Sequence, residues 1–228
     1  APDGASTRIA HGFLNLHHRA DPPAPLQAGA PITVSLMLDQ MAYRLAPGHR
    51  LRLALSNSYW PFVWPSPQGS PLTLTGGTLA LPVHSGDAPE AIFDPPPPVA
   101  TSRLQALTPP QASRERRIDQ ITGAERIIIR DDSGITRNPD HGLETRTVMV
   151  EDWSIHPDDP LCAACTITWE QSFARGDWSV KTRVEARQSG DAAFLYLEGA
   201  LHAEINDADE APEILTRNFH AHVARKHV

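Results

Sequence analysis

Residues 178–186 read Trp-Ser-Val-Lys-Thr-Arg-Val-Glu-Ala. Apolar side chains at positions 178, 180 and 184 alternate with polar or charged side chains at the positions between them. Successive side chains of a β-strand point to opposite faces, so alternation with a period of two is typical of a strand with one buried face. The stretch therefore predicts a β-strand, and the same pattern recurs along most of the chain.

The second half of the chain repeats this pattern with many charged residues. Further strands are predicted at residues 126–130, 145–150, 166–173, 193–205 and 213–223. The tetrapeptide Arg-Gly-Asp-Trp at 175–178 predicts the turn between two adjacent strands. Residues 111–121 predict a short helix instead.

The first half alternates as well, with fewer charges. Strands are predicted at residues 9–16, 32–38, 51–55, 72–74 and 79–83. Gly76-Gly77 has the chemistry of a tight hairpin between the last two, and Pro47-Gly48 predicts another turn. Together these segments indicate an antiparallel β-sandwich.

Proline content excludes helical architectures. The 228 residues include 22 prolines, 16 of them among the first 100. A proline inside a helix removes a backbone donor and clashes with the preceding turn, so coiled coils, helical bundles and helical solenoids are excluded. Four consecutive prolines at 95–98 favour extended chain. We therefore predict an all-β fold with a sandwich in residues 1–86, a Pro-rich strap at 87–113, and a β-rich extension at 114–228 that packs on or completes the sandwich.

Charge and hydropathy narrow the class of partner. The net charge of −7 gives no basic footprint, so we expect no nucleic acid as a partner. No apolar run approaches the 18 residues of a membrane span, so we expect no membrane partner. The first six residues have neither a charged nor an apolar leader region, which predicts a cytoplasmic protein.

Familiar catalytic patterns are missing from the sequence. No serine lies in a Gly-x-Ser-x-Gly turn, and there is no His-Glu-x-x-His pattern, phosphate-binding loop or Gly-x-Gly-x-x-Gly fingerprint. We therefore expect no catalytic residue, no metal and no cofactor in this chain.

Cysteines and histidines are the remaining reactive side chains. Cys162 and Cys165 lie three residues apart on a predicted strand, so they point to opposite faces and are expected to be free thiols. His220 and His222 share one face of the last predicted strand and are weak candidates for metal binding. Because no third ligand is visible in the sequence, a solvated strand face is the favoured interpretation.

The densest aromatic cluster lies between prolines, in a predicted loop. Its candidate ligand-binding or inter-domain residues are Asn57, Tyr59, Trp60, Phe62 and Trp64. One interpretation is an aromatic wall for an apolar or sugar ligand. The favoured one is an anchor that buries the loop in the sandwich or against a partner domain, since exposed aromatic loops are costly.

Several motifs of the first 85 residues carry a family resemblance. These are Ala-Pro-Asp-Gly-Ala-Ser at 1–6, Gly-Phe-Leu-Asn-Leu-His-His-Arg at 12–19, Pro-Gly-His-Arg-Leu-Arg-Leu at 47–53, and the stretch 56–67. They resemble the C-terminal domain of the CocE/NonD hydrolases, the X-Pro dipeptidyl-peptidase-like group also called peptidase S15. Residues 158–178 are similar to a longer C-terminal extension found in a subgroup.

This resemblance implies a fold and a partner. In the family this region is a jelly-roll, galactose-binding-like sandwich that packs on an α/β-hydrolase domain, and that domain carries the Ser-Asp-His triad. It implies a parent enzyme that cleaves X-Pro dipeptides or hydrolyses esters. The hydrolase domain and its triad have no counterpart here, so the chain alone is expected to be inactive. The family's sandwich also begins before the Pro-Asp-Gly motif, so its first strands are expected to be missing.

The expected function is therefore that of a non-catalytic β domain that caps a catalytic domain and shapes its substrate pocket. The expected partner is the α/β-hydrolase domain of the same parent protein, with a homo-oligomer as a further partner. A carbohydrate-binding module and an oligomerisation unit are the alternatives. Asn57, Tyr59 and Trp60 are the residues on which a sugar-binding platform depends.

Overall fold

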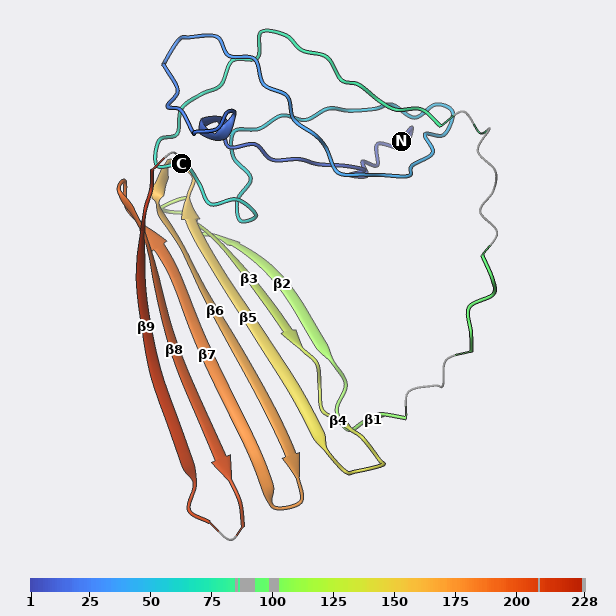
Figure 1. Cartoon of the computed structure of the whole chain (residues 1–228), viewed down its shortest axis with the longest axis vertical. Helices are drawn as coiled ribbons and strands as arrows, with labels where there is room; N and C mark the ends of the chain where they lie inside the picture. The colour runs from blue at the N-terminus through green and yellow to red at the C-terminus, as the bar shows by residue number, and fades with distance from the viewer. Residues whose placement is uncertain (85, 87–92, 99–102, 209, 227–228) are drawn as a thin grey trace.

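The computed structural model describes residues 1–84, 86, 93–98, 103–208 and 210–226 (Figure 1). Its main feature is one antiparallel sheet of nine strands, and the described residues contain one short 3-10 helix, η1 (Leu16–His18). The strands are β1 (Gln105–Ala106), β2 (Gln111–Ile118), β3 (Glu125–Asp132), β4 (Thr136–Arg137), β5 (Glu144–His156), β6 (Asp159–Arg175), β7 (Trp178–Gly190), β8 (Phe194–Asn206) and β9 (Glu213–Ala224). The predicted all-β fold class is confirmed.

The sheet is an up-and-down meander. Strands β5 to β9 pair with their neighbours in chain order, and the other edge of β5 pairs with both β3 and β4, which continue outward to β2 and β1 (Figure 1). The turn predicted at 175–178 is confirmed, since Arg175 and Trp178 are Cα partners and Gly176 adopts a φ of 59°. The predicted helix at 111–121 is wrong. Residues 111–118 form β2 because they pair along their whole length with β3.

The register of the ladders divides the side chains between two faces. Partners across a ladder share a face, and residues two apart on a strand share it too. Trp153 pairs with Cys165, Cys165 with Gln188 and Gln188 with Leu197, so these side chains share one face. We call it the apolar face; on β5 to β9 it carries Met149, Trp153, Ile155, Ala163, Cys165, Ile167, Trp169, Phe173, Trp178, Val180, Val184, Ala186, Leu195, Leu197, Leu201, Ala203, Ile205, Leu215, Phe219, Ala221 and Val223.

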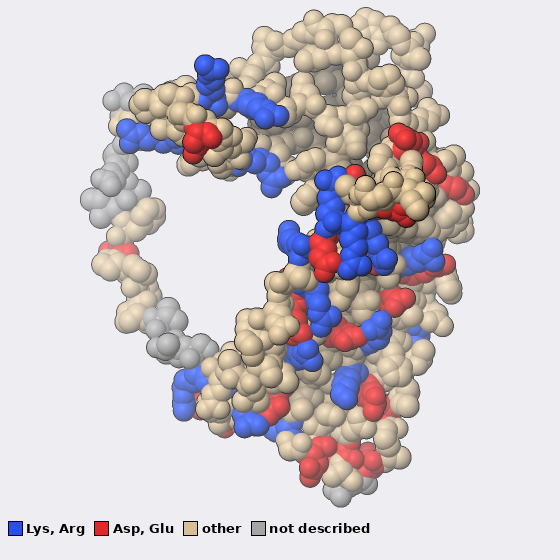
Figure 2. All heavy atoms as spheres, turned by 180° about the vertical axis from the view of Figure 1, so that it is seen from behind, with Lys and Arg blue, Asp and Glu red and all other residues tan. Residues whose placement is uncertain are grey.

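The opposite side, which we call the ion-pair face, carries cross-strand salt bridges. Arg126 pairs with Asp152, Arg183 with Glu170, and Arg146 with Asp132. Basic and acidic side chains lie next to one another over one side of the sheet (Figure 2). The more exposed pairs, Arg126 with Asp152 and Arg183 with Glu170, each add little stability, but opposite charges on neighbouring strands favour one register over its slipped alternatives.

A break separates β3 from β4, and Asp132 organises it. Its buried carboxylate accepts hydrogen bonds from Arg146 Nε at 3.0 Å and Nη2 at 2.6 Å, and from the Gly134 amide at 3.1 Å. The Arg146 guanidinium, helped by the Gly134 amide, holds the pKa of Asp132 well below its usual range. Gly134 itself has a φ of +67°, and a Cβ there would lie 2.3 Å from the Thr108 carbonyl oxygen.

The first 84 residues lie beyond the end of the sheet where β5 ends and β6 begins (Figure 1). They run as extended segments and turns without β-ladders, so the strands predicted at 9–16, 32–38, 51–55, 72–74 and 79–83 are wrong in this structure. Some of these segments still lie side by side: the Asp39 amide, for example, donates a hydrogen bond to the His11 carbonyl at 2.9 Å. Alternation indicates an extended chain with one apolar side, but a ladder also needs regular hydrogen bonds to a neighbouring strand. Only scattered backbone hydrogen bonds join the described segments of this half.

The two predicted turns of this half have different outcomes. Pro47-Gly48 forms a turn closed by a hydrogen bond from the His49 amide to the Ala46 carbonyl at 3.1 Å, as predicted. The hairpin predicted at Gly76-Gly77 is wrong, because residues 71–80 contain no turn. The Pro-rich strap lies partly outside the described residues, and its described prolines at 95–98 belong to no helix or strand.

Gly134→Ala tests the break between β3 and β4. The left-handed backbone costs a non-glycine residue about 1–2 kcal/mol, and the clash with Thr108 and Pro109 adds to it. We expect a clearly lower midpoint of urea unfolding. Gly176→Ala is the matched control, because Gly176 also has a positive φ but has no atom within 4 Å of its Cβ position. Equal losses in the two variants would contradict the close approach at Gly134.

Asp132→Asn tests the buried carboxylate. Because the folded-state pKa of Asp132 is depressed, its stabilisation is present above the ordinary value of 3.8 and is lost as the pH falls below it. We expect the melting temperature of the native chain to fall more steeply with acid than that of the variant, which loses this stabilisation at every pH. The exposed neighbour Asp131→Asn should leave the profile unchanged.

Candidate functional site

The aromatic loop at 59–67 meets the sheet at the end of the apolar face. The ring of Trp60 lies edge-on to that of Trp153 on β5, with centroids 5.6 Å apart and planes at 83°. Trp64 packs against Trp60 in the same way, with centroids at 5.3 Å. Edge-to-face contacts of this kind are favourable beyond the area they bury. The indole pair therefore attaches the first half of the chain to the sheet.

A second contact joins the loop to the far edge of the sheet. Arg225, directly after β9, donates from Nη2 to the Pro65 carbonyl at 2.6 Å and from Nη1 to the Asp191 carbonyl at 2.9 Å. Burial lowers the pKa of Arg225, against the opposing effect of Asp191. An arginine remains charged under either influence. The loop thus contacts both β5 and the segment after β9, across the width of this end of the sheet.

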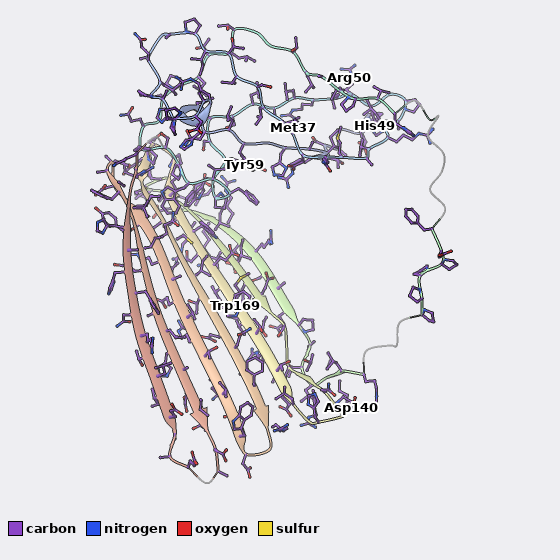
Figure 3. All side chains as sticks on the ribbon, viewed as in Figure 1. Met37, His49, Arg50, Tyr59, Asp140 and Trp169 are labelled. Atoms are coloured by element: carbon purple, nitrogen blue, oxygen red, sulfur yellow. The ribbon has the colours of Figure 1, made fainter. Side chains whose placement is uncertain are left out.

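Burial on the apolar face is greatest at this end. Ala163 and Cys165 are 2% and 4% exposed, and Cys165 is the direct Cα partner of Trp153. Trp169, on the same face further along β6, is 41% exposed and lies far from Tyr59 (Figure 3). The aromatic loop therefore lies at one end of the apolar face, and the middle of that face remains open.

The thiol of Cys165 is unreactive in this position. Burial, and then the carboxylates of Glu151 and Asp152, raise the pKa of its thiol to about 11. The thiol is protonated at neutral pH, whereas the reactive form of a cysteine is the thiolate. Cys162 lies on the other face of β6, and both cysteines are free, as predicted.

The aromatic cluster divides into two pairs. While Trp60 and Trp64 pack toward the sheet, Tyr59 and Phe62 stack on each other with centroids at 5.2 Å, and Phe62 is 73% exposed. Phe13 extends this second group, with its ring 5.4 Å from that of Tyr59. We call Phe13, Tyr59 and Phe62 the outer aromatic group.

Polar contacts fix the outer aromatic group. Arg8 Nη1 donates to the Tyr59 hydroxyl at 2.6 Å, which holds the phenol ring in place. Asn57 Nδ2 donates to the Ser70 carbonyl at 2.8 Å and so braces the loop. The residues proposed for a sugar platform therefore diverge: Trp60 packs on the sheet, and Asn57 is engaged by the backbone.

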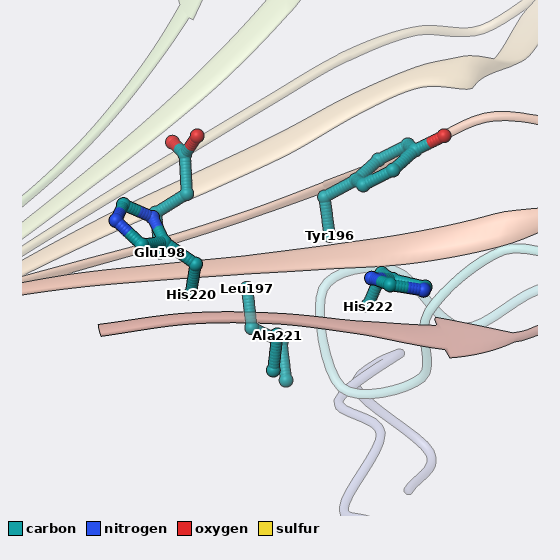
Figure 4. Close-up of a pocket in the computed structure, with 6 residues that line it drawn as sticks. All are labelled: Tyr196, Leu197, Glu198, His220, Ala221 and His222. Atoms are coloured by element: carbon teal, nitrogen blue, oxygen red, sulfur yellow. The ribbon is translucent and has the colours of Figure 1, made fainter.

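The two candidate histidines lie side by side on β9, above a shallow pocket of about 190 Å³ (Figure 4). Glu198 is the Cα partner of His220, and Tyr196 that of His222. These four side chains point to one side of the strands, whereas Leu197 and Ala221 point to the other (Figure 4). In the part of the chain that the structure describes, no group of three or more His, Cys, Asp or Glu side chains is arranged to hold a metal ion.

Sequence patterns gave no sign of the sheet-side partners of the loop. Trp153 lies beyond the strand predicted at 145–150, and Arg225 lies 160 positions from Pro65. Neither residue has local chemistry that singles it out. Only the folded chain brings them to the aromatic loop.

Comparison with known proteins gives one match. The family model of the X-Pro dipeptidyl-peptidase C-terminal non-catalytic domain matches residues 1–126. No curated protein and no solved structure matches the chain. Among the described residues, no helix has the length and hydropathy needed to cross a membrane.

Trp60→Ala and Phe62→Ala separate the two aromatic pairs. Removing the half-buried Trp60 ring should lower the free energy of unfolding by about 2 kcal/mol and speed proteolysis within residues 1–84. Removing the exposed Phe62 ring should change stability little. Thermal melts and limited trypsin digestion measure both effects, and a larger loss at Phe62 would contradict the assignment of Trp60 as the anchor.

Proposed function

The chain belongs to the family of C-terminal non-catalytic domains of X-Pro dipeptidyl-peptidases, and we propose that it caps the catalytic domain of such a hydrolase and shapes its substrate pocket. A non-catalytic domain of a peptidase implies a catalytic domain in the same protein. The proposed partner is an α/β-hydrolase domain of the peptidase S15 type, acting on X-Pro peptides or on esters in the cytoplasm.

The outer aromatic group is the proposed contact with that catalytic domain. This proposal is supported by the orientation of the loop. Trp60 packs on the sheet, whereas Phe62 is 73% exposed and stacks on Tyr59. Tyr59 is in turn held by a hydrogen bond from Arg8. Rigid, exposed aromatic rings supply large contact area at low entropic cost, and they are enriched in protein interfaces. A surface of this kind can close one wall of a neighbouring pocket without contributing a reacting group.

This proposal gives each of the three parts of the chain a role. Residues 1–86, which carry the aromatic loop, would form the part that meets the catalytic domain, with 87–113 as the strap. Residues 114–228 would form the extension that supports it, through the contacts of Trp153 and Arg225 with the aromatic loop.

Hydrolysis of an X-Pro dipeptide p-nitroanilide and of p-nitrophenyl acetate tests the non-catalytic role. We expect the chain alone to hydrolyse neither substrate above the rate of buffer, because the catalytic domain is the proposed source of the nucleophile. Turnover that a serine-directed phosphonate abolishes would contradict the proposal.

Phe62→Ala in the full-length hydrolase tests the contact. We expect kcat/KM for the X-Pro substrate to fall about tenfold, equivalent to about 1.4 kcal/mol, while the melting temperature of the β domain stays unchanged. Met37→Ala is the control, since Met37 is 91% exposed but is none of the three rings of the outer aromatic group. Equal kinetics in both variants would refute the outer aromatic group as the contact.

A further inference from the structure

The open middle of the apolar face is the largest feature that the proposed function does not use. Over the ranges 163–173, 178–188, 195–205 and 215–223, Arg217 is the one charged residue that the register assigns to this face. Many of its large side chains are more than a third exposed: Trp169, Val184, Leu197, Ile205, Leu215, Phe219 and Val223. An apolar patch this wide exceeds what monomeric proteins usually expose and marks an interaction surface.

The dimensions of this face suit a protein interface. Strands β5 to β9 contain 12 to 17 residues each. With a rise of about 3.3 Å per residue and about 4.8 Å between strands, they outline roughly 40 by 20 Å, or about 800 Å². Stable interfaces bury about 800 Å² on each partner. The whole face, of which the aromatic loop covers one end, is therefore close to the area that a dimer needs.

We propose that the apolar face binds a second copy of this chain, face to face, as a two-layer β-sandwich. A strongly charged partner has little to recognise on this face. A second copy presents the same largely apolar face, whose charged residues over β5 to β9 include Glu151 and Arg217, and its acidic and basic pairs remain on the outer ion-pair faces. Two such sheets pack about 10 Å apart with their strands rotated by about 30°.

The shape of the face fits a twofold arrangement. A hollow of about 420 Å³ lies beside Thr147, Met149 and Trp169, toward the β2 side of the face. Phe219, 55% exposed, projects from β9 at the other side. The successive Cα pairings from β9 to β5 place Phe219 at the same height along the strands as Glu151. Met149 is the next residue of β5 on the same face.

A twofold axis parallel to β7, between the two sheets, places β9 of one copy over β5 of the other. Phe219 of each copy then lies over the hollow beside Met149 of its partner. This is the reciprocal contact that a closed dimer requires. The arrangement is independent of the proposed contact with a catalytic domain, because it uses neither the aromatic loop nor the outer aromatic group.

Sedimentation equilibrium of the full chain tests the dimer, with Leu197→Lys and Ala200→Lys as matched variants of β8. Leu197 is 39% exposed on the apolar face, whereas Ala200 is exposed on the ion-pair face. We expect the native chain and Ala200→Lys to be dimers, and the dissociation constant of Leu197→Lys to rise at least about tenfold, because a lysine on the apolar face is desolvated on docking. Far-UV circular dichroism checks that both variants fold.

A monomeric native chain, or equal dissociation of the two variants, would overturn the proposal. A chain that stays monomeric but floats with phosphatidylcholine vesicles would overturn it in favour of a lipid surface. Higher oligomers that persist in Leu197→Lys would overturn it in favour of pairing through the β9 edge.

Thiol-specific cross-linking tests the twofold arrangement. In a Cys162→Ser background, Met149→Cys combined with Phe219→Cys should give a covalent dimer with a bismaleimide linker of about 10 Å, which matches the spacing of two packed sheets. These positions lie four strands apart within one chain, about 19 Å, which is beyond the reach of that linker. Met149→Cys combined with Asn218→Cys, which places the second thiol on the ion-pair face, should remain unlinked. Equal cross-linking of the two pairs would overturn the arrangement.

Discussion

The continuous antiparallel ladder from β5 to β9 is the constraint on which the rest of the structure depends. Its register decides that Trp153, Cys165 and Leu197 share a face, while Arg183 and Glu170 share the other. A slip of one residue would exchange the two faces of a strand. The apolar face, its closed end under the aromatic loop and its open middle all follow from this one register.

The aromatic loop links this sheet to the first half of the chain. Trp60 meets the sheet through Trp153, and Arg225 secures the same loop through Pro65. With the indoles turned inward, Tyr59 and Phe62 are left to face outward as a rigid pair. One short segment therefore holds the molecule together on one side and offers a contact surface on the other. For a non-catalytic domain, such a surface is the means by which it can influence a neighbouring active site.

Strong alternation made the sheet predictable. Strands β3 and β5 to β9 each overlap a predicted segment, because polar and apolar residues alternate there over long stretches. Residues 111–118 were predicted to be helical because arginine has a high helix propensity. They form a strand because they pair with β3 along their whole length. In the first half, alternation at 32–38 and 51–55 predicted two strands, but neither segment takes part in a β-ladder. Long-range contacts such as Trp60 with Trp153 have no local signature, so the candidate site was predictable only as an aromatic cluster.

Amide hydrogen exchange followed by mass spectrometry tests most directly the claim that the sheet is the stable unit to which the first half is attached. We expect slow exchange, at a common rate, in peptides from 144–206, and fast exchange in peptides from 32–38, 51–55 and 72–83, whose amides form no ladder. Protection of these three segments equal to that of β5 to β8 would contradict it, because it would show a second hydrogen-bonded sheet in the first half of the chain.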